Sequence, residues 1–430
     1  MSRALRTSGL TDVITTREDK DNPFLANVPP VPTLTEAMHL TEAHRSDDTT
    51  GWSVHERIVH HAADVHITDA TRASILINII GQVRSSYRDR DLRTQAYRDH
   101  AIRAQHFLHG SRGRHARTLP IRFAVAPRAK PRGIVVATPI AMGRKQLVDR
   151  IMLSIGDEPK VVRVTTATGF TEYLQLPALR ATWPLDGKLP GLAQGIIGAF
   201  DAAFHTAYAY STHTPLFRER DILPAICALG VASNLGLLVV ERINIQDTGT
   251  GAADSTWNAL AQFTRLTGIP VLCLPTPGAA AVSLSRLPGA RADLTAGGLI
   301  EIAPAHGPYE AHWIAMCNAI FDTTVRLAGI PSMPAGLPDT AYELTLGYPG
   351  LLAKVLTAVA LHLVALKTPA FSAEVLTKYG MRALKLDQPH IDAIRIIRQG
   401  GKFTSSSLIR YGDWLSFSQL APTHVMPELQ

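Results

Sequence analysis

One segment of the chain has the residue types and the setting of a phosphate-binding loop. The β-branched run GIVVAT (133–138) predicts a strand, and GRKQLVDRIMLSI (143–155) predicts a helix directly after a turn. In a working loop of this kind, GxxxxGK[ST], glycines let the backbone wrap the phosphates, a lysine reaches the β and γ oxygens, and a hydroxyl holds Mg²⁺. The turn between these two elements is therefore a candidate nucleotide site.

Most positions in this turn depart from that pattern. The six candidate nucleotide-binding residues are Thr138, Pro139, Gly143, Arg144, Lys145 and Gln146. Thr138 replaces the first glycine, whereas Arg144 stands where the lysine belongs and Lys145 where the hydroxyl belongs. A shift of one residue makes Lys145 the phosphate lysine, but Gln146 would then face the metal. We expect ATP and Mg²⁺ to bind weakly or not at all.

A second candidate lies at the end of another apolar run, LGLLVVERI (235–243). In an ATPase, the corresponding strand ends in Asp-Glu: the aspartate orients the magnesium shell and the glutamate polarises the attacking water. Here Glu241 stands at the first of these positions and Arg242 at the second. A guanidinium cannot act as a base, so the sequence predicts a protein that does not hydrolyse ATP.

The elements that would position these residues alternate between strands and helices. Further strands are predicted at 159–166, 179–182, 235–240, 269–274 and 299–303, and helices at 189–208, from about 220, around 254–267 and near 278–287. The strands are apolar throughout, which is typical of a parallel sheet covered by helices on both faces. We therefore predict an α/β core over residues 119–330.

Two further regions flank this core. Residues 1–50 are polar with a proline cluster and are predicted to form an extended arm, and residues 51–118 form a basic helical region that ends in a linker. Residues 331–430 are predicted to form a helical lid. Within the lid, Thr340 and Glu343 have the spacing of a capping box and would mark the start of a helix.

The surplus positive charge is concentrated in one stretch. The whole chain has a formal net charge of +7, but Arg84 to Arg132 alone contains thirteen Lys and Arg against three Asp, a net of +10. Such a concentration is typical of a polyanion-binding surface, although an ordinary exposed basic helix is the alternative. The candidate DNA-binding residues are Arg84, Arg88, Arg90, Arg112, Arg114 and Arg117.

Composition excludes several other classes of protein. Hydrophobic residues make up 46% of the 430 residues and charged residues only 18%, which argues against a long disordered chain. Three cysteines are too few for a disulfide scaffold, and His55, His60, His61 and His66 lack supporting ligands, so no metal site is predicted. The apolar stretch 350–366 contains Lys354 and His362 and favours a buried helix over a membrane span. We expect a cytoplasmic protein with no membrane partner.

The order of these elements resembles that of the TniB/TnsC-type AAA+ regulators of DNA transposition. Six pieces carry the resemblance: DNPFLANVPPVP (21–32), VRSSYRDRD (83–91), LPALRATWPLDGKLPGL (176–192), LGLLVVERI (235–243) with GIPVLCLPTPGAA (268–280), YELTLGYPGLLAKVL (342–356) and LKLDQPHIDAIR (384–395). The resemblance implies an AAA+ P-loop-type parallel sheet with helices on both faces, an N-terminal helical extension and a C-terminal helical lid.

The resemblance also suggests roles for individual residues. It places Thr276 at the sensor 1 position, although the neighbouring glycine of the family is Pro275 here. Arg291 stands where the family has an arginine finger that reaches the nucleotide of a neighbouring subunit, and Arg286 is a weaker candidate for that role. The alternative is that Arg291 is an ordinary surface arginine. Lys354 corresponds to a sensor 2 candidate or to a lysine whose stem merely covers apolar surface.

The function that the resemblance implies is regulation of DNA transposition, through target selection and transposase recruitment. Its implied partners are double-stranded DNA, a transposase, a TniQ-type target selector, and either further copies of this chain or an active AAA+ paralogue. Because the departures fall on the nucleotide chemistry, we expect a pseudo-ATPase scaffold. Two alternatives stay open: an active, divergent DNA-dependent ATPase that uses Lys145 and Glu241, and a domesticated AAA+-fold interaction protein.

Overall fold

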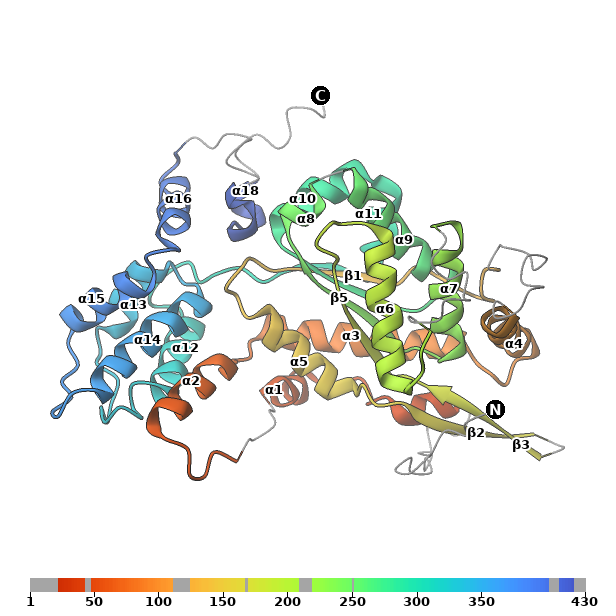
Figure 1. The fold of residues 1–430 in the computed structure, drawn as a ribbon, viewed down its shortest axis with the longest axis horizontal. Helices are drawn as coiled ribbons and strands as arrows, with labels where there is room; N and C mark the ends of the chain where they lie inside the picture. The colour runs from red at the N-terminus through yellow and green to blue at the C-terminus, as the bar shows by residue number, and fades with distance from the viewer. Residues whose placement is uncertain are drawn as a thin grey trace.

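The computed structural model describes residues 22–42, 48–110, 124–166, 169–208, 219–249, 251–401 and 410–420. At its centre is a sheet of five parallel strands in the order β4-β5-β6-β1-β7 (Figure 1). These strands are β1 (Gly133–Ala137), β4 (Ala178–Thr182), β5 (Leu237–Ile243), β6 (Val271–Pro275) and β7 (Leu299–Glu301). Every residue of β1 and β6 is buried, as the unbroken apolar runs predict.

Helices connect and cover these strands. They are α5 (Arg144–Ile155), α6 (Leu189–Phe204), α7 (Glu219–Ala232), α8 (Ile245–Thr248), α9 (Ala252–Thr267), α10 (Pro277–Arg286) and α11 (Pro288–Leu294). The turn that follows the inner strand β1 leads directly into α5, and the strand that ends in an acidic residue, β5, lies one strand further along the sheet beyond β6. This arrangement confirms the predicted α/β fold, a parallel sheet flanked by helices.

One predicted strand lies outside this sheet. Residues 160–166 form β2 (Lys160–Thr166), which pairs antiparallel with β3 (Gly169–Gln175) in a separate hairpin that projects from the core (Figure 1). The prediction that segment 159–166 belongs to the parallel sheet is therefore wrong. Its alternation explains why: Val162 is buried whereas Arg163 is exposed, which is the pattern of a strand with one solvated face.

The N-terminal region is helical for most of its described length. It contains the short 3-10 helix η1 (Pro23–Asn27), followed by α1 (Leu34–Glu42), α2 (Val54–Asp64), α3 (Ala70–Asp89) and α4 (Gln95–Gly110). The prediction of an extended arm over 1–50 is thus wrong for α1. A capping box begins that helix, since the Glu36 carboxylate accepts from Thr33 N at 2.7 Å and Thr33 Oγ1 accepts from Glu36 N at 3.4 Å.

The C-terminal region is helical as expected. Its helices are α12 (Ala311–Thr323), α13 (Leu337–Thr345), α14 (Pro349–Val364), α15 (Ala373–Ala383) and α16 (Gln388–Arg398), with the short helices η4 (Gly412–Trp414) and α18 (Phe417–Leu420). The helical lid begins before the predicted boundary at residue 331, because α12 packs against α13 and α14. The capping box predicted at Thr340 is not the start of α13. Leu337 and Pro338 begin that helix, because proline suits a first helical turn, and the Thr340 hydroxyl donates back to Gly336 O at 3.2 Å.

A single apolar core joins these parts. Phe24 of η1, Ile79 of α3, Val136 of β1, Trp257 of α9 and Leu352 of α14 all belong to one continuous cluster of buried side chains. The lid and the N-terminal helices are therefore packed onto the α/β core rather than tethered beside it.

Within the described chain, no single helix is long and apolar enough to cross a membrane. The helices α13 and α14 reach that threshold only as a pair that is bent by 117°.

Candidate functional site

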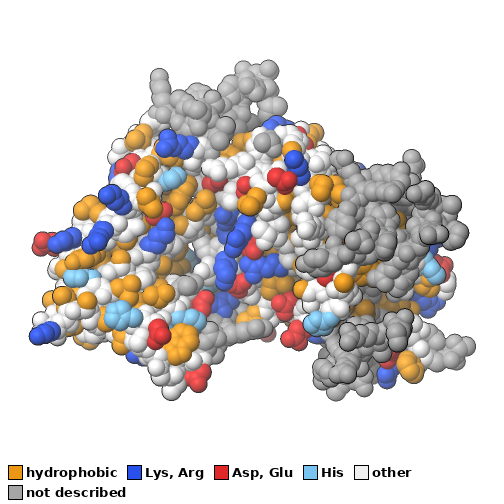
Figure 2. All heavy atoms as spheres, in the orientation of Figure 1, with side chains coloured by type: hydrophobic (Ala, Val, Ile, Leu, Met, Phe, Trp, Pro, Cys, Tyr) orange, Lys and Arg blue, Asp and Glu red, His pale blue; other side chains and the backbone are white. Residues whose placement is uncertain are grey.

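A cavity of about 330 Å³ opens at the carboxyl ends of β1 and β5. Its walls come from the turn before α5 and the start of α5, the end of β5, the end of α2, the helix α12 and the start of α14. The lining residues are Ala62, Val65, Ala141, Gly143, Arg144, Lys145, Gln146, Glu241, Arg242, Met316, Ile320, Pro349, Gly350 and Ala353. Figure 2 shows Lys and Arg side chains gathered around a hollow between the lid and the α/β core. The structure thus brings four residues of the predicted loop together with Glu241 and Arg242.

The turn between β1 and α5 is packed against protein on two sides. Thr138 N donates to Pro275 O at 2.9 Å, and Ile140 N donates to Asp413 O at 2.9 Å. On the lid side, Gly350 N donates to Ala141 O at 2.8 Å. Thr138 and Pro139 are buried and do not line the cavity. Two candidates from the predicted loop are therefore structural, and bonds within the chain hold the backbone of the turn at residues 138, 140 and 141.

Glu241 is neutralised by a residue that the sequence analysis missed. Its carboxylate accepts two hydrogen bonds from Arg180 of β4, Nε to Oε1 at 3.0 Å and Nη2 to Oε2 at 2.7 Å, and only 6% of the residue is exposed. Arg180 also pairs with Asp149 at 2.6 Å, and Asp149 pairs with Lys145 at 2.8 Å. A charged residue within the otherwise apolar strand 178–182 was the signal that could have identified Arg180.

These contacts determine the charge states in a row of ion pairs that links Lys145, Asp149, Arg180 and Glu241. Burial alone would raise the pKa of Asp149, but hydrogen bonds from Lys145 and Arg180 lower it below its ordinary value. Burial opposes the charge of Arg180, yet its contacts with Glu241 and Asp149 raise its pKa. Each oxygen of Glu241 accepts a hydrogen bond from the same guanidinium, so a metal ion at this carboxylate would have to compete with Arg180.

Arg242 follows at a β-bulge in β5, where the register shifts between Val240 and Ile243. Its φ is +59°, a left-handed conformation that costs a non-glycine residue about 1–2 kcal/mol. The bulge leaves this side chain exposed at the wall of the cavity, while Glu241 before it and Ile243 after it are buried. The position at which a catalytic base was sought therefore presents a cation to the cavity.

Arg144 is the second cation of the cavity wall. Its Nη2 donates to Asn244 Oδ1 at 3.0 Å. Burial lowers the pKa of its guanidinium, and the negative charges of Asp413 and Glu241 oppose that effect. Among the residues that the structure describes, neither Arg144 nor Arg242 forms an ion pair with a carboxylate, so the wall carries an excess of positive charge.

Thr276 does not line the cavity and is already bonded to protein. As the N-cap of α10, its hydroxyl accepts from Ala279 N at 3.1 Å and donates to Asp413 Oδ1. The same carboxylate oxygen accepts from Ile245 N at 2.8 Å. Asp413 was not predicted, and no pattern around it in the sequence indicated that it reaches the core.

The remaining nucleotide-site candidates point elsewhere. Arg291 is exposed on α11, whose last residue Leu294 packs against Gly133 at the amino end of β1, whereas the cavity opens at the carboxyl end of that strand. Arg286 pairs with Asp254 at 3.2 Å. Lys354 pairs with Asp387 at 2.8 Å, which accounts for its charge within the lid.

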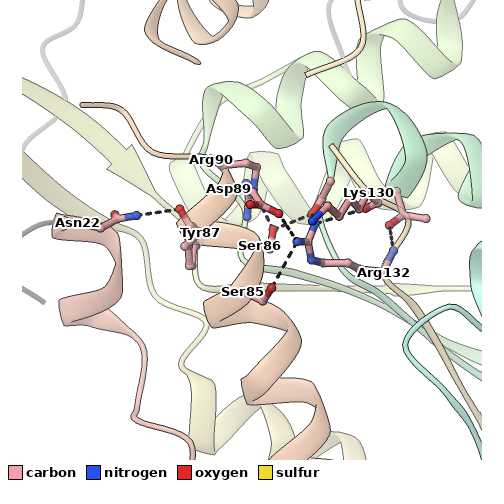
Figure 3. A network of polar contacts seen from close by, with 10 residues as sticks. Asn22, Ser85, Ser86, Tyr87, Asp89, Arg90, Lys130 and Arg132 are labelled. Carbon is pink, nitrogen blue, oxygen red and sulfur yellow. Dashed lines mark hydrogen bonds and ion pairs between the residues drawn. The ribbon is translucent and has the colours of Figure 1, made fainter. Parts of the chain in front are cut away.

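The basic stretch is partly structural. Arg84 is 7% exposed and donates to Leu25 O at 3.3 Å, Val28 O at 2.8 Å and Pro29 O at 3.2 Å. Arg90 is 1% exposed; its guanidinium lies 4.8 Å from the centre of the Tyr87 ring, and its Nε donates to Ser86 Oγ at 2.9 Å (Figure 3). Assigning Arg84 and Arg90 to a DNA-binding surface is therefore wrong, because buried guanidinium groups cannot contact a phosphate.

Other cations of the stretch do reach the surface. Arg88 is exposed beside Asp89, which pairs with Arg132 at 2.5 Å (Figure 3). Arg128 and Lys130 are exposed just before Arg132, which is buried. Arg88, Arg128 and Lys130 therefore lie near the amino end of β1, away from the cavity. Arg112, Arg114 and Arg117 lie outside the described residues. No group of His, Cys, Asp and Glu in the described chain could hold a metal ion.

No protein-family model and no curated protein matches this chain. Solved structures give distant likenesses. A Walker-type ATPase of Pyrococcus abyssi is 13% identical, covers 68% of this chain and 82% of its own, and has a TM-score of 0.37. A RuvB mutant of Thermotoga maritima is 12% identical, covers 68% of this chain and 77% of its own, and has a TM-score of 0.36. The ADP form of the Aeropyrum pernix ORC2 protein is also 12% identical, covers 78% of this chain and 84% of its own, and has a TM-score of 0.37. Likenesses at this level carry no argument about activity, ligand or partner.

Proposed function

We propose that this chain is a DNA-associated regulator or scaffold of DNA transposition that is built on an AAA+ fold and is defective in ATP hydrolysis. The transposition role rests on the six sequence segments that resemble the TniB/TnsC-type regulators. The loss of hydrolysis rests chiefly on one observation: both oxygens of Glu241 accept hydrogen bonds from Arg180. The adjacent position, Arg242, is a cation and supplies no base.

Two parts of the hydrolytic reaction are affected. Metal-assisted phosphoryl transfer needs a carboxylate-ordered magnesium shell and a group that orients the attacking water. Here the carboxylate is bound by a guanidinium, and losing a general base alone costs a factor of about 10²–10⁴ in rate. Because the two losses are separate, we expect no measurable turnover.

An ATP-binding and hydrolysis assay tests this proposal. We expect the purified full chain neither to bind ATP with micromolar affinity nor to release phosphate in the presence of Mg²⁺. Micromolar affinity together with Mg²⁺-dependent turnover that is abolished by Glu241→Gln would overturn it. Arg163→Ala, on the projecting hairpin, provides a matched control for substitution effects unrelated to the site.

The second candidate is the divergent ATPase. A cavity of about 330 Å³ with Arg144, Lys145 and Arg242 in its wall favours retention of an anionic ligand. The same assay separates the two functions, because the divergent ATPase predicts turnover and the scaffold does not. The domesticated interaction protein differs in its partners instead, and genes for a transposase or a TniQ-type selector beside this one would favour the transposition role.

The proposed DNA partner would contact the chain away from the cavity. Arg88, Arg128 and Lys130 are exposed near the amino end of β1 and supply cations for phosphate contacts. The proposed assembly is a homo-oligomer or a mixed assembly with an active AAA+ paralogue, in which Arg291 would reach the paralogue's nucleotide. Support for this assignment is the exposure of Arg291 on α11, a helix that packs near the amino end of β1 and does not line this chain's own cavity.

A further inference from the structure

The chain's last described segment, residues 410–420, lies between the α/β core and the lid. We call it the C-terminal strap; it contains η4 and α18, and Figure 1 shows α18 between α16 of the lid and α10 of the core. On the core side, Asp413 O accepts from Ile140 N at 2.9 Å, and Phe417 N donates to Glu301 Oε1 at 2.6 Å. Gly278 of α10 lies so close to Gly412 that a Cβ at position 278 would be 2.6 Å from Gly412 O.

The strap also contacts the lid. Trp414 O accepts a hydrogen bond from the hydroxyl of Tyr348, the N-cap residue of α14. The Trp414 ring lies 5.1 Å from the His390 ring of α16, and Leu415 beside it is fully buried. One short segment therefore packs against both parts of the molecule, next to the direct contact between Gly350 and Ala141.

The Asp413 carboxylate is the most specific attachment of the strap. It is 7% exposed and accepts two hydrogen bonds through Oδ1, from Ile245 N at 2.8 Å and from the Thr276 hydroxyl. Burying a carboxylate is costly unless it is hydrogen-bonded, and bonds to a charged acceptor are about twice as strong as neutral ones. Burial raises the pKa of Asp413 and the two hydrogen bonds oppose this shift.

We propose that the strap fastens the lid to the α/β core and that Asp413 is its latch, so that the lid position is set by the chain itself rather than by a bound ligand. The donors that hold the latch, Thr276 and Ile245 N, are at the carboxyl ends of β6 and β5, beside the cavity wall that contains Arg144. This inference goes beyond the proposed function, because it requires neither DNA nor nucleotide.

Hydrogen exchange of the full chain, followed by mass spectrometry without nucleotide or DNA, tests the latch. Asp413→Ala should accelerate amide exchange about tenfold in the lid peptide 348–353 as well as in the turn 139–143, although the Asp413 side chain contacts neither. Asp413→Asn retains a side-chain oxygen acceptor and should stay within about threefold of the wild type. Asp157→Ala, an exposed aspartate after α5, is the matched control and should change neither peptide.

Two results would overturn the latch. One is an Asp413→Ala protein whose exchange is faster only in the strap and around Ile245 and Thr276, with the lid unchanged. The other would come from Tyr348→Phe, a variant that removes the strap's hydrogen bond to the lid. This variant tests whether the strap holds the lid even if Asp413→Ala does not fold. This variant should accelerate exchange in 348–353 and leave residues 245–248 unchanged; an unaltered lid peptide would contradict the proposal.

Discussion

Arg180 on β4 holds Glu241 at the end of β5 in a two-point contact, with Nε 3.0 Å from Oε1 and Nη2 2.7 Å from Oε2. The register of the two strands places Thr182 opposite Glu241, so the guanidinium reaches the carboxylate diagonally from two residues earlier. The pair converts a potential metal ligand into part of a structural row of charges that also contains Asp149 and Lys145.

This pair should contribute to stability. Arg180→Ala leaves the Glu241 carboxylate buried without its main partner, and we expect the free energy of unfolding to fall by about 2 kcal/mol in urea titrations. Arg163→Ala, which removes the half-exposed pair with Glu172, is the control and should cost less than about 1 kcal/mol. Equal losses in the two variants would show that Arg180 is not a buried-pair partner.

The contact between the turn and the lid should depend on the small size of Gly350. A Cβ at this position would lie 2.9 Å from Ala141 O, so Gly350→Ala must push α14 away from the turn. We expect a loss of about 1–3 kcal/mol in thermal or urea unfolding. Gly289→Ala in α11 meets nothing within 4 Å and should be neutral or stabilising; a similar loss in both variants would contradict the packing argument.

The exposed cations near the amino end of β1 should contribute to DNA binding. Neutralising Arg88, Arg128 and Lys130 together should flatten the log–log dependence of affinity on salt by up to about three, without a change in sequence preference. The comparison is a triple variant of Lys378, Arg382 and Lys385, which are exposed on the lid. A flattened slope only after changing Arg112, Arg114 and Arg117 would assign binding to that segment instead.

Assembly on DNA should be independent of ATP. We expect oligomers on duplex DNA, detected by sedimentation or electron microscopy, to be the same with and without an ATP analogue. Arg291→Ala should leave these oligomers unchanged and should lower only the ATPase activity of a mixed assembly with an active paralogue. A filament that forms solely with ATP would show that the cavity functions as a nucleotide site.

His66 should make the protein sensitive to mild acid. Burial, together with the charges of Arg72 and Arg150, lowers its pKa from 6.5 to about 3, so below pH 6.5 the unfolded chain gains a proton that the folded chain does not. Stability should therefore fall as the pH falls, by about 2 kcal/mol from this residue between neutral pH and about pH 5. Urea unfolding of His66→Gln should lack this contribution. His55→Gln, on the exposed face of α2, is the control, and identical pH dependence in the wild type and His66→Gln would contradict the assignment.

Local patterns in the sequence were sufficient to predict the framework of the fold. Unbroken apolar runs predicted the parallel strands, because a strand that is buried on both faces is apolar at every position. The helical lid was predicted from its long apolar helices. The sequence also identified residues 143–146 and the pair Glu241–Arg242 as candidates, and the structure places both in the wall of one cavity. Segment 159–166 was misassigned because its alternation of apolar and polar residues, typical of a strand with one solvated face, was not distinguished from a fully apolar run.

Side-chain partners far apart in sequence were decided only by the tertiary structure. Arg84 and Arg90 belong to a basic stretch by composition, yet packing against residues 25–29 and Tyr87 turns them inward. Arg180 and Glu241 are 61 positions apart, and Thr276 and Asp413 are 137 apart. Charge and hydrogen-bonding capacity are visible in a sequence, but burial and partner choice depend on which surfaces the folded chain brings together, and no local pattern specifies that.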